Sequence, residues 1–270
     1  MLNKFTIITG GQGPGKTTTV AKILAILYMI EPMLKVALAA PTGKAAVRMG
    51  ESLKASHINL PEAIMEKFKA LVPTTIHRLL KYVPDSPYFR HDKNNPLIHD
   101  LVIIDEASMI DAALFAKLLG AIGPGSRIIL LGDKDQLASV EAGSLLGDLC
   151  QTQLQINLLS AENIEAINSF IPDSERKITD NYISTGDNIL SENIIELKHS
   201  RRFMGDGGIG KFSKAIIRGE LDIITSFVNK GGDQTVVVDN SYSDELFNRF
   251  ISDYENYIKE KDIAAALLKL

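Results

Sequence analysis

The stretch Gly10-Gly11-Gln12-Gly13-Pro14-Gly15-Lys16-Thr17 fits the pattern G-x-x-x-x-G-K-[ST] at every fixed position. The pattern predicts a buried strand over residues 5–8 before this stretch and a helix over residues 18–30 after it. Glycines let backbone N–H groups curl around an anion, and a helix N-terminus adds a partial positive charge. We therefore predict that residues 10–18, Thr18 included, hold nucleotide phosphates. Lys16 would reach the β- and γ-phosphates, and the Thr17 hydroxyl would ligate Mg²⁺.

One position within this stretch is unusual. Pro14 has no N–H, so one possible phosphate donor is missing from the loop. The alternative to phosphate binding is a glycine-rich strand-to-helix turn that binds nothing.

The composition is that of an ordinary globular protein, with 270 residues, of which 45% are hydrophobic and 23% charged. A single cysteine, Cys150, excludes an internal disulfide framework and fits a reducing, cytoplasmic compartment, where we expect it to be a small buried apolar residue. The first residues lead straight into a strand, which predicts no signal peptide. The net charge of −4 does not exclude a local grip on nucleic acid.

Strand and helix signals alternate through residues 1–150. Apolar runs predict strands over residues 35–40, 101–104 and 127–131, and helices are predicted over residues 43–54, 61–71, 74–81 and 111–122. This alternation predicts an α/β domain with a doubly wound parallel sheet, whose functional groups lie at the carboxyl ends of the strands. Residues 82–99, rich in Pro, Asn and Asp, predict an exposed loop or short hairpin.

The periodic pattern weakens after residue 150. We interpret residues 151–193 as a linker or insertion. A second α/β unit is predicted from residue 194 onward, with strands over 194–197 and 235–238 and helices over 209–218 and 244–259.

A carboxylate pair, Asp105-Glu106, follows the predicted strand 101–104. Hydrolysis of a nucleoside triphosphate needs one carboxylate to hold Mg²⁺ and a base to orient the attacking water. We assign Asp105 to the metal and Glu106 to the water. A solvated helix start is the alternative for an Asp-Glu pair.

Three further groups of polar residues follow strands. Gln136 lies after the strand 127–131, where it could contact a γ-phosphate or belong to an ordinary turn. Thr42 and Lys44 open a helix, with Thr42 its predicted N-cap, and suit a second phosphate such as a nucleic-acid backbone. Thr75 and His77 offer similar groups at another helix start. Paired arginines at 201–202 could supply a cation to the γ-phosphate, although such pairs often lie on solvated faces.

Taken in this order, the motifs resemble those of superfamily 1 DNA helicases, and most closely the RecD family, the alpha subunits of exodeoxyribonuclease V. The matching runs are Ala39–Ala46, Thr75–Leu80, Asp105–Asp111, Gly132–Gly143, Ser200–Phe203 and Gly207–Gly210. The resemblance covers nearly all of residues 4–220 and is poorest over residues 151–193.

The resemblance implies a RecA-like P-loop fold and an ATP-driven 5′→3′ translocase on single-stranded DNA. It would work beside RecB and RecC subunits in a helicase–nuclease that acts in double-strand break repair. In the ATP site, the resemblance implies ATP·Mg²⁺ binding by Lys16 and Thr17, metal binding by Asp105 and water activation by Glu106. It also implies γ-phosphate sensing by Gln136 and a cation supplied across the cleft by Arg202. The residues that it implies as contacts to single-stranded DNA are Thr42, Lys44, Thr75 and His77. The loop 82–99 falls where relatives carry a small strand-separating hairpin.

The chain departs from the family pattern G-G-P-G-T-G-K-T, because Gln12 and Pro14 stand where the family has Pro and Thr. It also lacks the family's N-terminal domain and the late motifs of the second motor domain. We therefore expect a fragment that contains the first motor domain and part of the second. The competing hypotheses are a non-catalytic nucleotide-binding scaffold and a P-loop ATPase that is not a helicase.

Overall fold

The computed structural model describes residues 3–11, 15–55, 60–136, 145–152, 155–184, 186, 188–198, 208–228, 248, 251–252 and 259–260. The chain forms two compact units, residues 1–202 and residues 203–270, and each is described by itself.

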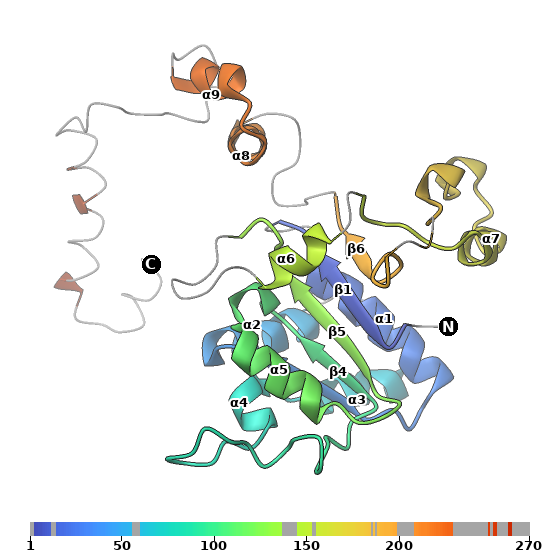
Figure 1. The fold of residues 1–270 in the computed structure, drawn as a ribbon, viewed down its shortest axis with the longest axis vertical. Helices are drawn as coiled ribbons and strands as arrows, with labels where there is room; N and C mark the ends of the chain where they lie inside the picture. The colour runs from blue at the N-terminus through green and yellow to red at the C-terminus, as the bar shows by residue number, and fades with distance from the viewer. Residues whose placement is uncertain are drawn as a thin grey trace. The chain divides into compact units, whose positions relative to one another are not determined.

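The first unit is built on a six-stranded parallel sheet with the strand order β3-β2-β4-β5-β1-β6 (Figure 1). The strands are β1 (Phe5–Thr9), β2 (Val36–Ala40), β3 (Thr74–Thr75), β4 (Leu101–Ile104), β5 (Arg127–Gly132) and β6 (Ile194–Glu196). In the centre of the sheet, Ile128 of β5 lies opposite Val102 of β4 and Phe5 of β1. The predicted doubly wound parallel sheet is confirmed.

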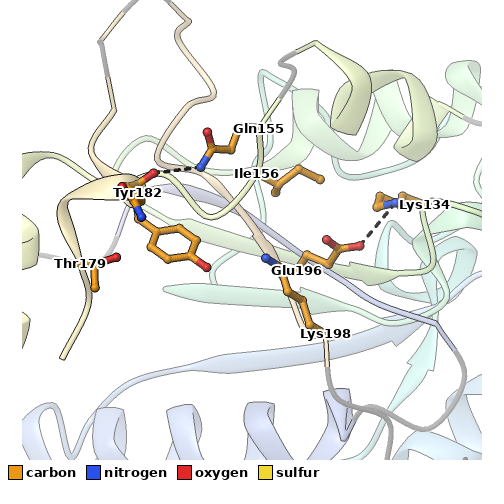
Figure 2. A pocket seen from close by; sticks show the side chains of 8 residues that line it. Lys134, Gln155, Ile156, Thr179, Tyr182, Glu196 and Lys198 are labelled. Atoms are coloured by element: carbon orange, nitrogen blue, oxygen red, sulfur yellow. Dashed lines mark hydrogen bonds and ion pairs between the residues drawn. The ribbon is translucent and has the colours of Figure 1, made fainter. Parts of the chain in front are cut away.

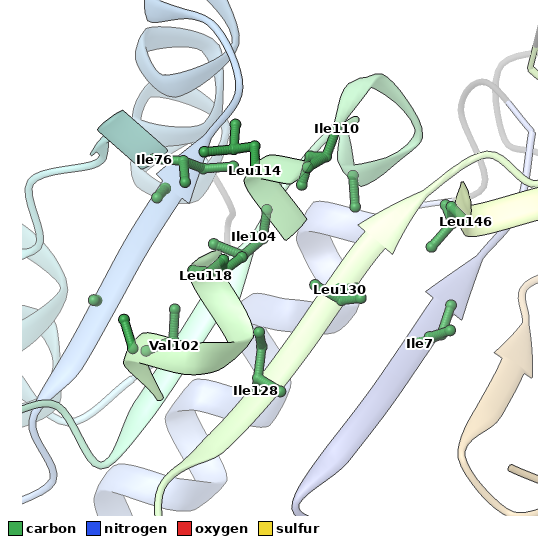
Figure 3. Close-up of a cluster of buried hydrophobic side chains, with 14 of the residues drawn as sticks. Ile7, Ile76, Val102, Ile104, Ile110, Leu114, Leu118, Ile128, Leu130 and Leu146 are labelled. Carbon is green, nitrogen blue, oxygen red and sulfur yellow. The ribbon is translucent and has the colours of Figure 1, made fainter. Parts of the chain in front are cut away.

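Helices cover both faces of this sheet. One apolar cluster joins the sheet to α1 (Lys16–Ile30), α2 (Gly43–Lys54) and α3 (Glu62–Ala70). The other joins it to α4 (Ile76–Leu79), α5 (Ala112–Ala121) and α6 (Leu145–Gln151), as Figure 3 shows. Neighbouring strand residues alternate between the clusters, as Ile103 and Ile104 do, because successive side chains of a strand point to opposite faces.

Cys150 lies within the second of these clusters and is 2% exposed. Burial raises the pKa of its thiol to about 11, so the thiolate that would react is scarce at neutral pH. The prediction of a small buried apolar residue is confirmed.

Side-chain caps fix where several helices begin. The hydroxyl of Thr42 accepts a hydrogen bond from Ala45 N at 3.2 Å, which confirms the predicted N-cap of α2. The carboxylate of Asp111 accepts one from Leu114 N at 2.8 Å at the start of α5. Such caps satisfy backbone N–H groups that have no partner within the helix.

The predicted helix over residues 74–81 is wrong at both ends. Thr74 and Thr75 form β3, which pairs in parallel with the end of β2, and only Ile76–Leu79 is helical. Threonine favours extended backbone when a neighbouring strand is available for pairing. Lys81, with a φ of 56°, takes a left-handed conformation that stops the helix.

The predicted strand over residues 194–197 exists, but it does not open a second unit. It is β6, which pairs in parallel with β1 and completes the first sheet. Ile194 is fully buried in the cluster beneath α5 and α6, so the strand belongs to this core. The boundary between the units falls after residue 202 instead.

Two irregular segments of the first unit have local structure. Within the predicted loop 82–99, antiparallel bridges join Tyr82 to Phe89 and Asp92 to Asn95. Residues 151–193 carry α7 (Ala161–Ser169) and the short 3-10 helices η2 (Ser174–Arg176) and η3 (Asp180–Tyr182). A bridge between Leu159 and Ile183 closes this excursion before β6.

The second unit is described mainly through α8 (Gly208–Arg218) and α9 (Leu221–Val228). The rings of Phe212 and Phe227 meet edge to face at 5.2 Å between centroids. The helix predicted over residues 209–218 and its stop at Gly219, with a φ of 66°, are confirmed. The predicted strand 235–238 and most of the predicted helix 244–259 lie outside the described residues. Within the described part of the chain, no helix is long and apolar enough to cross a membrane.

Candidate active site

The phosphate-binding stretch lies between β1 and α1, as predicted. Gly15 precedes α1 with a φ of 84°, a left-handed conformation that glycine adopts without steric cost. Among the described residues, no side chain caps α1, and its first turn contains no acidic residue. Its first N–H groups therefore remain available to an anion, and no carboxylate of that turn repels the anion.

Lys16 is the first residue of α1, and its side chain turns back over the loop. Its ammonium group donates to the carbonyl oxygens of Gly10 at 2.6 Å and Gly11 at 3.3 Å.

Thr17 and Thr18, both half-buried, follow in the first turn. The uncapped helix start, the cation over the loop and the two hydroxyls fit a phosphate group with a bound metal ion. Gln12, Gly13 and Pro14 lie outside the described residues.

Asp105 continues the line of β4 beyond the end of the strand. Its N–H donates to Ala39 O at 2.9 Å, and its carboxylate accepts from Glu106 N at 2.9 Å. The pKa of Asp105 is raised, mainly because the carboxyl group is buried and to a smaller extent because of the negative charge of Glu106. The hydrogen bond from Glu106 N–H and the positive charge of Lys16 act in the opposite direction and lower this pKa. Lys16 is close enough for its charge to act on this carboxylate, so the two predicted residues lie in the same region of the fold.

Glu106 has a φ of 52°, which is uncommon for a residue with a side chain. Backbone of this kind costs roughly 1–3 kcal/mol and persists only where its surroundings enforce it. The turn ends the direction of β4 and leads into the 3-10 helix η1 (Ala107–Met109). The left-handed turn at Glu106 thus places the carboxylate pair at an abrupt end of β4.

Gln136 reaches the carboxylate region through a side-chain hydrogen bond. The Ser108 hydroxyl donates to its Oε1 atom at 2.5 Å, although the two residues lie 28 positions apart. Ser108 is 4% exposed, whereas Gln136 is exposed. Because its oxygen is engaged, the amide nitrogen of Gln136 is left to donate to another acceptor. The sequence contained both residues, but only the folded chain shows that they form a pair.

Gly132 allows the ends of β4 and β5 to approach each other. A Cβ atom at this position would lie 2.3 Å from Leu146 Cδ2 and 3.1 Å from Ser108 N. A side chain here would displace the Leu146 side chain and press against the backbone at Ser108. The glycine is therefore favoured by packing at the site, a role that its place in the sequence motif did not reveal.

A second set of contacts, absent from our predictions, ties the segment after β5 to β1 and β6. Lys134 N donates to the hydroxyl of Thr9 at 3.0 Å, and Thr9 is fully buried. The Lys134 ammonium pairs with Asp135 at 2.9 Å and Glu196 at 3.4 Å. Burial lowers the pKa of Lys134, but the two carboxylates more than offset this and raise it overall.

Lys134 and Glu196 line a polar cavity of about 550 Å³ beside the end of β6 (Figure 2). Tyr182 lies on its opposite wall, with the Lys198 ammonium 5.6 Å from the centre of its ring. The cavity shows that Gln155, Thr179 and Tyr182, from the segment between α6 and β6, lie beside the edge strand β6. Sequence periodicity alone gave no sign of this arrangement.

The predicted nucleic-acid contacts lie at the ends of β2 and β3, next to each other in the sheet. Thr42, Lys44 and His77 are exposed, and Thr75 is half-buried. The Thr75 hydroxyl accepts from Arg78 N at 3.2 Å, the same capping role that Thr42 has in α2. A capping hydroxyl uses its oxygen as an acceptor and keeps its O–H free to donate to a phosphate.

The structure therefore brings together Lys16, Asp105, Glu106 and Gln136 at the ends of β1, β4 and β5, and it places Thr42, Lys44, Thr75 and His77 at or just after the ends of β2 and β3. The predicted cross-cleft cation, Arg202, lies outside the described residues. Its role stays a prediction.

Two curated bacterial proteins are similar to this sequence over most of its length. The RecBCD enzyme subunit RecD of Haemophilus influenzae is 40% identical over 230 residues, which cover 81% of this chain and 34% of that protein. The ATP-dependent RecD2 DNA helicase of Deinococcus radiodurans is 31% identical over 272 residues, covering 91% of this chain and 35% of that protein. The chain thus spans about a third of the length of these curated relatives.

Among solved structures, the crystal structure of Bacteroides sp Pif1 in complex with ADP-AlF4 matches with a TM-score of 0.37 and 18% identity, covering 87% of this chain and 44% of that chain. The AAA domain family matches residues 1–142. Because this match takes in more than half of the 270 residues, the chain belongs to the AAA domain family, and it is similar to RecD subunits over most of its length.

Proposed function

We propose that this chain is the ATP-hydrolysing part of a RecD-like DNA helicase motor. The observation that carries the proposal is the convergence of Lys16, Asp105, Glu106 and Gln136 at the carboxyl ends of adjacent strands. A cation, a metal-binding carboxylate, a base and an amide donor are the groups that phosphoryl transfer to water requires. The names of the relatives, RecD subunit and RecD2 DNA helicase, agree with this function.

ATP is the proposed substrate and Mg²⁺ the proposed cofactor. Lys16 and the N–H groups at the start of α1 would hold the β- and γ-phosphates, while Thr17 and Asp105 would supply oxygen ligands to the metal. Mg²⁺ would neutralise charge on the phosphate oxygens. Glu106 would orient and deprotonate the attacking water, and the amide nitrogen of Gln136 would donate to the γ-phosphate.

The proposed partners are single-stranded DNA and, in the whole protein, RecB- and RecC-like subunits. Thr42, Lys44, Thr75 and His77 would contact the DNA backbone, and Arg202 would reach the γ-phosphate across the cleft between two motor domains. Residues 203–270 would be part of the second motor domain. The proposal includes 5′→3′ translocation, a cytoplasmic setting and a role in double-strand break repair within a RecBCD-type helicase–nuclease.

We test the proposal by phosphate release from ATP·Mg²⁺ with and without single-stranded DNA. Turnover that rises when DNA is added, without unwinding of a duplex by this chain alone, is the expected result. Turnover that does not change with DNA would favour a P-loop ATPase of another kind. Absence of ATP binding at millimolar nucleotide would contradict the hydrolytic function altogether.

A non-catalytic nucleotide-binding scaffold is the second candidate, and Pro14 is the observation that favours it. Proline lacks the N–H that another residue would offer to a phosphate at this position. Replacement Pro14→Thr restores a donor, so a large gain in turnover would show that the native loop is impaired. Similar turnover in the two proteins would show that the native loop is sufficient for hydrolysis.

A further inference from the structure

A shallow hollow of about 240 Å³ lies between the hairpin segment 82–99 and the last turns of α5. Its lining combines aromatic and cationic side chains: Tyr88, Phe89, His91, Lys93 and Lys117, with Asp92 and Gly120 completing it. Most of its surface is apolar. Pockets for drug-sized ligands measure roughly 300–1,000 Å³, so this hollow suits a single planar group rather than a whole ligand of that kind.

The backbone around the hollow is held in place by α4. Tyr82 N donates to His77 O at 2.9 Å, and Arg90 N and His91 N donate at 3.0 Å to the carbonyl oxygens of Lys81 and Leu80. The bridge between Tyr82 and Phe89 closes the hairpin. A ligand would therefore meet a surface that is already ordered, which lowers the entropic cost of binding.

The charges in the hollow are arranged to receive an anion beside an apolar group. Among the described residues, neither Lys93 nor Lys117 has an acidic partner. Lys117 donates to Pro87 O at 2.8 Å and lies 5.5 Å above the centre of the Phe89 ring. Asp92, the carboxylate among these lining residues, accepts from Asn94 N at 2.8 Å and Asn95 N at 3.0 Å.

The hollow is continuous with the proposed DNA contacts. The His77 ring lies 5.7 Å from the Phe89 ring, so Phe89 sits between His77 and Lys117. Tyr88 is 74% exposed, which leaves most of its ring uncovered. Single-stranded nucleic acid is bound elsewhere by this combination of stacking rings and a cationic surface that follows the backbone.

We propose that this hollow receives one unpaired base of single-stranded DNA, stacked on Tyr88, while Lys117 and Lys93 face the adjoining phosphates. The inference rests on the proposed function, because it extends the single-strand path from His77 along the hairpin. The hairpin would supply the stacking ring of Tyr88 and the charge of Lys93, and α5 would supply the charge of Lys117.

The first test measures the affinity of the chain for a labelled single-stranded oligonucleotide of about 16 thymines, in the absence of ATP. This length is at the upper end of the binding-site sizes of single-stranded-DNA-binding OB folds. Tyr88→Ala should weaken binding about tenfold, within the range reported for loss of one stacked base. Tyr88→Phe, which keeps the ring, should restore it. Phe170→Ala removes a ring that is 86% exposed at the end of α7 and should leave affinity unchanged.

The second test varies salt. Lys117→Gln should reduce the slope of log Kd against log salt by about 0.7, the value for one phosphate contact to a single strand. Lys117→Arg keeps the charge and should keep the slope. The fluorescence of a 2-aminopurine base in the oligonucleotide should be quenched when wild type or Tyr88→Phe binds, and should be quenched less when Tyr88→Ala binds.

Unchanged affinity in Tyr88→Ala and Lys117→Gln, or no affinity of the wild-type chain for single-stranded DNA, would overturn the inference. It would also be overturned if the hollow docked another protein, since Tyr88→Ala would then bind DNA like wild type. If Tyr88→Ala weakens DNA binding but the wild-type chain does not turn over ATP, only the proposed hydrolytic function is contradicted. Turnover stimulated by DNA with no effect of Tyr88→Ala would contradict only this inference.

Discussion

The carboxyl ends of β1, β4 and β5 hold their polar side chains differently from the ends of β2 and β3. In the first region, Thr9 and Ser108 are buried, and each accepts or donates a hydrogen bond to the segment after β5. In the second region, Thr42, Lys44 and His77 are exposed, and the threonine hydroxyls cap helices. Chemistry requires groups held in fixed positions, whereas a polymer that moves past a surface requires groups it can reach.

Apart from Glu106, the largest effect on turnover is expected at Asp105. Asp105→Asn removes a proposed metal ligand, and turnover should fall by about 10²–10³-fold, the range for loss of one charge-stabilising group. Phosphate release at saturating ATP and Mg²⁺ measures this. Turnover within twofold of wild type would show that Asp105 is not a metal ligand.

The same replacement should stabilise the fold at neutral pH. Because burial raises the pKa of Asp105 in the folded state, the stability that its neutral form contributes at low pH is lost as the pH rises through that folded pKa. The amide of the Asp105→Asn variant stays neutral, so the gain should be present at neutral pH and vanish when wild type is protonated. Urea unfolding across this pH window tests the sign, and a gain that grows toward low pH would contradict it.

The next effect concerns the close approach at Gly132. Gly132→Ala should destabilise the fold by about 1–3 kcal/mol, as overpacked core positions do, because the new methyl overlaps Leu146. Gly120→Ala in α5 is the matched control: among the described residues, nothing lies within 4 Å of the place its new methyl would take, and it should stabilise by about 0.5–1 kcal/mol. Thermal unfolding distinguishes them, and equal effects would refute the packing argument.

A smaller effect is expected at Ser108. Ser108→Ala leaves Oε1 of Gln136 without its donor, so the amide should lose its fixed orientation and kcat should fall about tenfold. The apparent KM for ATP should change little, because Lys16 and the helix start hold the phosphates. A higher KM with an unchanged kcat would assign Ser108 to binding instead.

The smallest effect is expected at the exposed end of β2. Thr42→Ala removes the cap of α2 and should destabilise the fold by about 1 kcal/mol. Thr42→Ser keeps the capping hydroxyl and serves as the control. Turnover without DNA should stay unchanged in both variants, while DNA stimulation should weaken in Thr42→Ala. Equal loss of turnover with and without DNA would break the distinction between the two regions.

Much of this fold follows from local sequence. The run that became β4 is fully apolar and the run that became β5 is apolar after Arg127, which is typical of strands covered on both faces. The capping side chains Thr42 and Asp111 mark helix starts. Lys16, Asp105, Glu106 and Gln136 were predicted because each belongs to a recognisable motif that follows a predicted strand. Their meeting at one edge is a consequence of parallel strands.

The parts that sequence did not predict depend on contacts between distant segments. Thr74 and Thr75 become extended because β2 lies beside them, and β6 joins the first sheet because β1 had a free edge. The left-handed Glu106 and the pairing of Ser108 with Gln136 arise where two strands end together. No local pattern distinguishes these positions from ordinary turns.

The most direct measurement of the central claim is ATP turnover in Glu106→Gln beside Glu51→Gln. Glu51 is exposed on α2 and gives a charge-matched control away from the proposed site. The account predicts that Glu106→Gln binds ATP like wild type but turns it over about 10²–10⁴-fold more slowly, whereas Glu51→Gln turns it over normally. Turnover of Glu106→Gln equal to that of wild type would contradict the assignment of hydrolysis to the ends of β1, β4 and β5.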